Sequence, residues 1–576
     1  MHGRLVALVV ACFALAASPS PAQISPITHQ PAPIVACFAE GTDPAYVERI
    51  HTYVELHNQL FYAADYNLGS RWSGSQGTPR TLSWSLVPDT VFIPGGIGEP
   101  SSNSNLFATM DSGFAAQGGR ATWVNRFQQV FDRWSALTGI TYVRITAPGQ
   151  DWDDGASWGS SGSSTRGDIR IGMHFIDGGS GVLAYNSFPP GGDMVLDSGD
   201  INNFASSSNQ NRFLRNTIAH EHGHGIGIAH VCTNNSSQLM EPFLSSAFDG
   251  PQQDDIRAGQ RHYGDPHELN ESFGAARPLG TLNPSGSLTL GTIPAPPTGG
   301  NDPFAALLSI DADGRSDWFW FSAASAMSAT ITVTPIGSTY ESNTQNSNGS
   351  CNSGLSVNAL AVADLAVTLY ASNGTTVIAG AASAGAGLAE TISNAPLTTG
   401  AHYLRVYETN APAQTQLYRI TITSVCSGPV ITQHPSQPQV EVGQPMELTA
   451  AATGATSVRW RKNGVPLTDD GRITGSTTTT LQIDPTVMND SGEYDFTATN
   501  ACSTAISNPV NVVIACYPNC DGSTFPPVVN VADFACFLTR YAAGEPYANC
   551  DGSTTEPVLN VADFGCFLTR FAAGCP

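Results

Sequence analysis

The stretch HEHGHGIGIAH, residues 220–230, places four histidines, one glutamate and three glycines in eleven positions. Residues four apart share a face of an α-helix, so His220 and His224 can bind one metal ion together. Glu221 lies beside them, where a carboxylate can take a proton from a water at that metal. Gly227 can adopt the left-handed conformation that ends a helix, and the chain can then bring His230 back as a third nitrogen ligand. Three nitrogens leave one position of a tetrahedral metal ion open for chemistry.

A histidine-rich surface helix without metal is the alternative for this stretch. His222 falls off the metal-facing side, and we expect it to face solvent or to support a ligand from behind. The full spacing H-E-x-x-H-x-x-G-x-x-H resembles that of the metzincin zinc endopeptidases. Met240, in QLMEPF, resembles their methionine turn in its matrixin form. LSWSLVPD, GVLAYNSFPPGGDMVLDSGD and DDIRAGQRHYG resemble further matrixin segments, so the likeness covers about residues 80–265.

This resemblance implies one catalytic zinc on His220, His224 and His230, with Glu221 as the general base toward a zinc-activated water. Val231 stands where matrixins usually carry serine, which leaves the subfamily open. Tyr185 and Val195 occupy positions where matrixins hold a second, structural zinc with histidines, so we expect that ion to be absent. Candidate calcium ligands nearby are Asp177, Asp197 and Asp200, which are otherwise solvated turn acids.

Cys37 is the single cysteine between the signal segment and the predicted catalytic segment, and no PRCGxPD latency peptide accompanies it. We expect it to form a disulfide with Cys232; as an alternative, its thiolate caps the zinc. Both roles are open to an exported protein, in which disulfides persist.

Helices and strands at residues 80–266 must position the metal-binding stretch. TLSWSLVPDT alternates as a strand, and TWVNRFQQVFDRWSALTGI (122–140) has the apolar spacing of a helix with Gly139 as its stop. TYVRI and DIRIGMHF follow as strands, and residues 212–227 form the second helix with Ile218 and Ala219 buried. This order predicts an α+β domain.

Two β-rich segments follow. Short alternating strands over 267–425 predict an all-β sandwich. NESFGAARPLG and SDWFWFSA resemble the pre-peptidase C-terminal domain, which implies either matrix binding or a passive spacer. Residues 427–514 resemble an immunoglobulin-like domain, with Trp460 as core tryptophan, Tyr494 as tyrosine corner and Phe496 in place of a core cysteine. Cys426 pairs with Cys502 or with Cys351.

The last segment, 515–576, is a tandem repeat in which NCDGST recurs at Asn519 and Asn549. Each copy is a polar loop and a helix, with apolar Phe534, Phe537 and Leu538 or Phe564, Phe567 and Leu568, so the two copies can pack together. The module resembles a dockerin of a cysteine-containing type, which implies anchoring to a cohesin-like or surface partner; a stable terminal cap is the alternative. The candidate calcium ligands are Asn519, Asp521, Asn530, Asp533, Asn549, Asp551, Asn560 and Asp563. Repeat symmetry suggests the disulfides Cys520–Cys536, Cys550–Cys566 and Cys516–Cys575.

The 576 residues carry 24 lysines and arginines against 47 aspartates and glutamates, and this net charge of −23 argues against nucleic-acid binding through charge. Residues 1–22 have the layout of a secretory signal peptide, and no later segment is long and apolar enough to span a membrane. We therefore expect a secreted or cell-surface protein with an N-terminal segment (23–79) and the four domains 80–266, 267–425, 427–514 and 515–576. The sequence predicts a zinc endopeptidase acting on extracellular proteins, with a non-enzymatic adhesion protein carrying a degenerate protease domain as the alternative.

Overall fold

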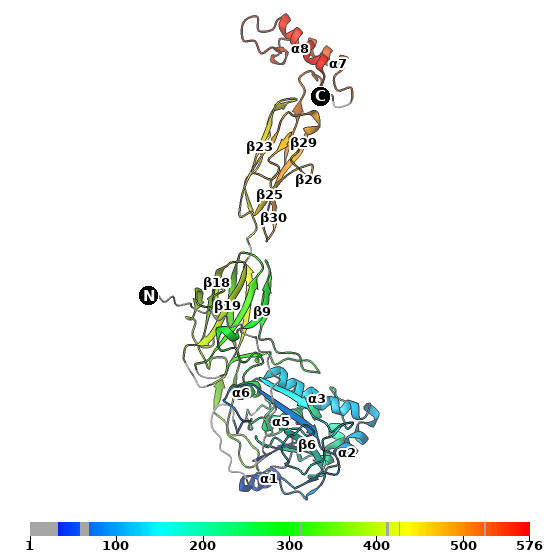
Figure 1. Cartoon of the computed structure of the whole chain (residues 1–576), viewed down its shortest axis with the longest axis vertical. Coiled ribbons are helices and arrows are strands. Elements are labelled where there is room, and N and C mark those ends of the chain that lie inside the picture. Colours follow the sequence, from blue (N-terminus) through cyan, green and yellow to red (C-terminus); the bar gives the residue numbers. More distant parts are fainter. Residues whose placement is uncertain are drawn as a thin grey trace, which may run out of the picture.

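The computed structural model describes residues 33–57, 68–233, 235–311, 314–410, 414–425, 427–523 and 526–575. Four bodies follow one another along its long axis, from an N-terminal α+β domain to a small helical module at the C-terminal end (Figure 1). The expected signal peptide lies outside the described residues. Among the helices in the described part of the chain, none has the length and apolar composition that a bilayer span requires.

The α+β domain is built on a six-stranded sheet with the order β1-β7-β8-β6-β2-β5. The pairs β1·β7 and β7·β8 are antiparallel, and the remaining pairs are parallel. Strand β1 comes from residues before position 80, so the N-terminal segment completes the sheet instead of standing apart from it. The strands are β1 (Ile34–Phe38), β2 (Arg80–Leu86), β5 (Ile140–Arg144), β6 (Ile169–His174), β7 (Val182–Ser187) and β8 (Met194–Asp197).

Two helices, α3 (Arg120–Leu137) and α5 (Arg212–Gly225), form the core of this domain with the sheet. The indole of Trp134 on α3 donates to the carbonyl of Ala219 on α5 at 3.1 Å. The predicted first helix therefore exists, but it ends at Leu137 because Thr138 is extended. The other elements here are α1 (Pro44–His57), α2 (Leu106–Gly113), α4 (Ile201–Phe204), α6 (Gln253–Tyr263), β3 (Phe92–Ile93), β4 (Ser102–Asn103) and the 3-10 turns Ala115–Gln117 and Ser198–Asp200.

The second body is a sandwich of two five-stranded sheets, as the alternating strands predicted. One sheet runs β10-β20-β13-β18 with β11 on β20, and the other runs β17-β16-β19-β12-β9. Its strands are β9 (Arg277–Leu282), β10 (Ser287–Leu290), β11 (Leu308–Ile310), β12 (Ser316–Ala323), β13 (Met327–Ile336), β16 (Leu365–Tyr370), β17 (Val377–Ala381), β18 (Glu390–Leu397), β19 (Gly400–Glu408) and β20 (Gln416–Val425), after a 3-10 turn at Phe273–Ala275.

The sandwich packs directly on the α+β domain through α6. Leu137, Ile256 and Leu417 belong to one buried apolar cluster that crosses the boundary. Buried Arg257 of α6 donates to the Thr415 carbonyl at 3.0 Å. A small hairpin of β14 (Thr339–Glu341) and β15 (Ser356–Asn358) also projects from the sandwich. The residues between its two strands, 342–355, are called the sandwich loop below.

The third body has paired strands and an immunoglobulin-like core. Trp460 is buried with its ring 5.2 Å from that of Phe496, and the Tyr494 hydroxyl donates to the Asp490 carbonyl at 2.7 Å, as a tyrosine corner does. Its elements are β21 (Val430–Gln433), β22 (Val440–Glu441), β23 (Met446–Thr449), β24 (Ala451–Thr453), β25 (Ser457–Lys462), β26 (Val465–Pro466), β27 (Ile473–Thr474), β28 (Thr480–Ile483), a 3-10 turn (Met488–Asp490), β29 (Gly492–Thr499), β30 (Thr504–Ile506), β31 (Val510–Val512) and β32 (Ile514–Ala515).

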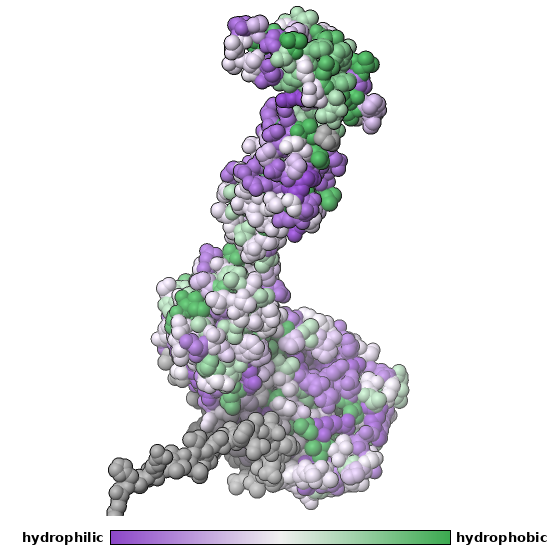
Figure 2. All heavy atoms as spheres, turned by 45° about the horizontal axis from the view of Figure 1, so that its top comes forward, coloured by the Kyte–Doolittle hydropathy of each residue, from purple (hydrophilic) through white to green (hydrophobic). Residues whose placement is uncertain are grey.

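The C-terminal module pairs α7 (Val531–Ala542) with α8 (Val561–Ala573), with a 3-10 turn at Pro546–Ala548 between them. Phe537 and Phe567 stack with ring centres 3.9 Å apart, so the two copies bury their apolar sides on each other. Hydrophobic side chains also gather on the surface of this module (Figure 2). The three predicted disulfides, Cys516–Cys575, Cys520–Cys536 and Cys550–Cys566, are confirmed.

The repeat carboxylates cap helices. Asp533 accepts from the backbone N–H groups of Asn530 at 2.8 Å and Asp521 at 3.1 Å. Asp563 does the same in the second copy. The side chains of Asn530 and Asn560 cap the helices in return, whereas the amides of Asn519 and Asn549 donate to carbonyls of their own loops. Calcium binding by these residues stays a prediction.

Candidate metal centre

His220, His224 and His230 converge through their Nε2 atoms. The three Nε2–Nε2 distances are 3.1 Å, 3.2 Å and 3.2 Å, and all three side chains are buried. Nitrogens bound tetrahedrally to zinc at about 2.0–2.1 Å lie roughly 3.3 Å apart, so the three rings fit one zinc ion. The predicted ligand set is thus brought together, and each ring presents the atom that zinc binding needs.

The chain reverses between the second and third histidine at Gly227. Helix α5 ends at Gly225, and Gly227 has a φ of 97°, the left-handed region that the sequence predicted for it. Its N–H donates to the His224 carbonyl at 2.9 Å, and its carbonyl accepts from Gly69 at 2.7 Å. These bonds fix the turn from both sides and direct His230 back toward α5.

Each Nδ1 has an acceptor that orients its ring. His220 Nδ1 lies 2.7 Å from the Leu239 carbonyl and His224 Nδ1 lies 2.7 Å from the Ile228 carbonyl. His230 Nδ1 lies 2.9 Å from the side-chain oxygen of Gln345. Donation from Nδ1 leaves the Nε2 lone pair free for a metal. Burial lowers the pKa of His220 to about 4 and holds those of His224 and His230 well below the usual value, so all three rings are neutral at pH 7.

Glu221 lies beside the ligands with its carboxylate fully buried. Burial raises its pKa well above the usual range, and a backbone interaction with Cys37 acts in the opposite direction. The thiol of Cys37 belongs to the same cluster: its Sγ, a ring nitrogen of His220 and a carboxylate oxygen of Glu221 lie within 4.8 Å of one another. This site therefore holds a base, a thiol and three imidazoles in one enclosed space.

The expected Cys37–Cys232 disulfide is wrong. Cys37 is a free, buried thiol, because β1 directs it toward Glu221. Cys232 is bonded instead to Cys351 of the sandwich loop. That bond also excludes a Cys351–Cys426 pair; Cys502 is disulfide-bonded, and Cys426 itself lies outside the described residues.

Strand β1 lies between β7 and the segment that follows Met240. It pairs antiparallel with β7 and bridges Phe243 in parallel through Phe38. The Phe38 carbonyl accepts from Leu244 N–H at 3.0 Å. A piece of extended chain thus runs past the metal centre with hydrogen bonds on both sides, and it carries Cys37, whose Sγ lies within 4.8 Å of a His220 ring nitrogen.

Met240 packs against α5, the helix that carries His220 and His224, and its role as the floor of the site stays a prediction. It is buried, and a Cβ atom on Gly223 of α5 would lie 2.3 Å from its sulfur. Asp255 holds this turn by accepting from the N–H groups of Leu239 and Met240 at 2.8 Å and 3.0 Å. Sequence reasoning missed Asp255, although its position in the first turn of α6 marks it as a capping acid.

His222 does not face solvent. Its ring is fully buried against Phe131, with Nε2 2.6 Å from the Tyr142 hydroxyl oxygen. Burial lowers its pKa to about 3, so it is a neutral core side chain. The prediction that it faces solvent is wrong because α5 is enclosed on all sides, and its side away from the metal contacts α3 and β5.

The three turn acids bind the backbone. Asp197 accepts from the N–H groups of Ile176 at 2.9 Å, Gly178 at 2.9 Å and Gly199 at 2.7 Å. Asp177 accepts from Val182 at 2.9 Å, and Asp200 accepts from Ser180 at 3.1 Å. Among the described residues, they do not belong to the groups whose ligand atoms lie within 4.8 Å of one another. Their calcium binding stays a prediction. At the place of the second matrixin zinc, Tyr185 donates to Glu99 at 2.9 Å.

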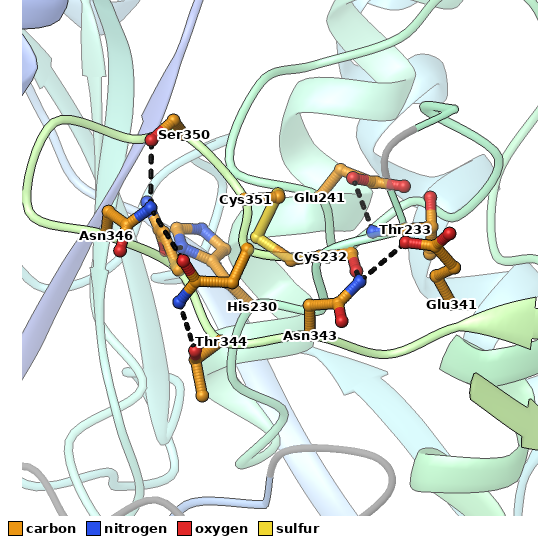
Figure 3. Close-up of a disulfide and its surroundings, with 12 residues drawn as sticks. His230, Cys232, Thr233, Glu241, Glu341, Asn343, Thr344, Asn346, Ser350 and Cys351 are labelled. Carbon is orange, nitrogen blue, oxygen red and sulfur yellow. Dashed lines mark hydrogen bonds between the residues drawn. A yellow bond between two sulfur atoms is a disulfide. The ribbon is translucent and has the colours of Figure 1, made fainter. Parts of the chain in front are cut away.

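The sandwich loop reaches the metal centre beside the Cys232–Cys351 bond (Figure 3). The N–H of Asn343 donates to the Cys232 carbonyl at 3.0 Å, and Gln345 contacts His230. The sequence held no signal for this contact, because the two residues are 115 positions apart in different domains.

Comparisons with known proteins agree with this geometry. The Matrixin family model matches residues 113–264, and the Immunoglobulin domain model matches residues 428–500. A 180-residue region, 31% of this chain, is 29% identical to interstitial collagenase from Bos taurus. The match spans 35% of that protein, about a third of its length.

Solved structures with local likeness include titin M4, 26% identical over 15% of this chain and 96% of that one, with a TM-score of 0.14. Domains 3–5 of Drosophila OTK are 15% identical over 31% of this chain and 56% of that one, with a TM-score of 0.18. The Matrixin match includes the three histidines, so residues 113–264 form a matrixin-like domain, and residues 428–500 form an immunoglobulin-like domain.

Proposed function

We propose that this chain is a secreted zinc endopeptidase that hydrolyses peptide bonds of extracellular proteins. The convergence of three neutral imidazoles at 3.1–3.2 Å, with the Glu221 carboxylate beside them, carries the proposal. The matrixin match and the collagenase relative support it. The disulfides between described residues support export, because such bonds persist in oxidising compartments.

His220, His224 and His230 would hold the zinc ion, which when bound supplies a Lewis acid that polarises a carbonyl and lowers the pKa of water. Glu221 takes the proton from the attacking water and delivers it to the departing amine. Burial suits Glu221 to this task, since a carboxylate with a raised pKa is a stronger base than a solvated one. Met240 and Asp255 hold the backbone beneath the ligands in place.

We propose that the protein is latent while β1 lies in place. Without β1, strand β7 would be an edge strand beside the histidines, where an extended peptide can pair by strand addition. Strand β1 occupies that edge and brings the Cys37 thiol to His220 and Glu221. In the zinc-loaded resting protein Cys37 would supply a fourth ligand, and activation would require β1 to leave. The immunoglobulin and C-terminal modules would then serve binding and anchoring.

Zinc content and casein hydrolysis test this function. We expect the purified exported chain to hold one zinc ion, and to hydrolyse casein once β1 is displaced by limited proteolysis or a thiol-reactive mercurial. A chelator should abolish this hydrolysis and zinc should restore it. A His224→Ala variant, treated in the same way, serves as the control without a complete site. A zinc-loaded chain that stays inactive after cleavage between residues 40 and 80 would favour the non-enzymatic adhesion protein instead.

A further inference from the structure

The three metal-facing histidines differ in what holds them. His220 and His224 donate to backbone carbonyls of their own domain, Leu239 and Ile228. His230 relies on a side chain, Gln345, carried by the sandwich loop of the next domain. The acceptor on the far nitrogen of a metal-binding imidazole sets its tautomer and direction, so the third ligand depends on how the second domain docks.

A chain of hydrogen bonds fixes which way the Gln345 amide points. His51 Nδ1 lies 2.8 Å from the Ser347 carbonyl, which only accepts, so this nitrogen carries the proton. In the neutral form of the ring the other nitrogen accepts, and it lies 3.4 Å from Gln345 Nε2. Gln345 must therefore donate to His51 with its nitrogen and turn its oxygen toward His230, which is the orientation that a metal-binding His230 requires.

The sandwich loop is tied to the metal turn covalently. Cys232, two residues after His230, is bonded to Cys351 with a Cα–Cα distance of 5.4 Å. Within the loop, Asn352 N–H donates to the Thr344 carbonyl at 3.0 Å and Asn346 N–H donates to the Ser350 carbonyl at 2.8 Å. These bonds bracket Gln345, so the disulfide fixes its position relative to His230.

We propose that Gln345 is a positioning residue for the metal ligand His230, and that the Cys232–Cys351 disulfide holds it there, so that the β-sandwich completes the metal centre of the matrixin domain. The inference rests on the proposed zinc site. It assigns to the second domain a role in metal binding that differs from matrix binding or spacing.

Zinc affinity, measured by competition with a chromophoric chelator, tests the role of Gln345. Loss of an imidazole-orienting partner typically lowers metal affinity about 10–100-fold, and we expect this loss in Gln345→Leu. Gln345→Glu keeps an acceptor oxygen at the same reach and should retain the affinity. Ser347→Ala is the matched control, since that side chain is exposed on the same loop and the carbonyl bonded to His51 is kept. The visible spectrum of the cobalt-substituted protein should change in Gln345→Leu and not in Ser347→Ala.

The disulfide is tested in the same assay. A Cys232→Ser/Cys351→Ser double variant should also bind zinc more weakly. Adding Gln345→Leu to this double variant should lower the zinc affinity by a smaller factor than in the wild-type background, because the two changes act on one contact. Mass mapping of the C-terminal disulfides and tryptophan fluorescence report whether each variant is folded.

Equal zinc affinity and an unchanged cobalt spectrum in folded Gln345→Leu would overturn the role of Gln345. A full effect of Gln345→Leu in the background without the disulfide would overturn the role of the disulfide. In either case tight zinc binding by the wild type would leave the proposed function standing. A wild-type chain that binds no zinc would overturn both the proposed function and this inference.

Discussion

The backbone of Gly227 lies directly against that of Ser70: a Cβ atom on Gly227 would stand 2.2 Å from the Ser70 carbonyl oxygen. The neighbouring Gly69 N–H donates to the Gly227 carbonyl, and Leu68 bridges Ile228. The turn that returns His230 to the metal therefore requires a residue at position 227 that adopts a left-handed backbone and has no side chain.

Gly227→Ala should therefore weaken zinc binding by tenfold or more and lower the thermal midpoint. The alanine would face both the strain of a φ of 97° and the clash with Ser70, so the turn must move. Chelator competition and a thermal scan measure the two effects. Gly149→Ala is the matched control, because Gly149 also has a positive φ but nothing within 4 Å of its Cβ position. Similar losses of zinc affinity and thermal stability in both variants would show that the positive φ, and not the clash with Ser70, causes the effect.

Glu221→Gln should keep zinc and lose activity. The amide has the shape of the carboxylate but cannot accept the proton, and loss of a general base typically costs about 10²–10⁴-fold in rate. The values of kcat/KM on a peptide substrate, together with zinc content, check this after β1 has been displaced. Activity close to wild type in a variant with full zinc would contradict the role of Glu221.

Cys37→Ser should make the unprocessed chain more active. Each 1.4 kcal/mol removed from the closed state shifts its equilibrium about tenfold, so we expect casein hydrolysis to rise by about that factor or more. The comparison is with Glu40→Ala, an exposed change just beyond β1. The wild-type thiol should also react with a disulfide reagent faster after zinc is removed. Unchanged casein hydrolysis by unprocessed Cys37→Ser would show that Cys37 does not keep the protein latent.

His262 should contribute to the acid sensitivity of the matrixin domain. Its Nε2 donates to the Gly227 carbonyl at 3.1 Å, and burial, with Arg71 and Arg261 nearby, lowers its pKa from 6.5 to about 4. Between these values the unfolded chain binds a proton that the folded chain does not. Stability from this group is therefore complete above pH 6.5 and is lost as pH falls toward 4, by about 3 kcal/mol at most.

The measurement is the difference in thermal midpoint between wild type and His262→Gln across that pH range, followed by tryptophan fluorescence. Glutamine can still donate to Gly227 but does not titrate, so the variant should lose less stability in acid. Parallel curves for the two proteins would show that His262 does not contribute.

The sequence was sufficient for features set by local spacing. The i, i+4 pair on α5, Gly227 just after the helix, and Met240, ten residues after His230, predicted where the ligands and the methionine turn would lie. The apolar spacing of Phe127, Phe131 and Trp134 predicted α3, and repeat symmetry predicted the three C-terminal disulfides.

Contacts between residues far apart in the chain could not be predicted from the sequence. Residues 34–38 carry no strong pattern, so nothing indicated that they would join the sheet edge beside the histidines. Cys37 and Cys232 looked like partners because export favours disulfides, yet tertiary packing sends them to different neighbours. His222 was misplaced because periodicity gives the face of a helix but not whether another element covers it. Gln345 belongs to a loop of polar residues in which no single side chain stands out.

The Cys232–Cys351 bond closes a ring of polypeptide with a sequence separation of 119 residues, and this ring includes the boundary between the matrixin domain and the sandwich. A single peptide-bond break within the ring leaves two fragments that remain one covalent molecule until the cystine is reduced. A chain that a protease cuts once within this ring therefore keeps the segment of the neighbouring domain that contacts His230.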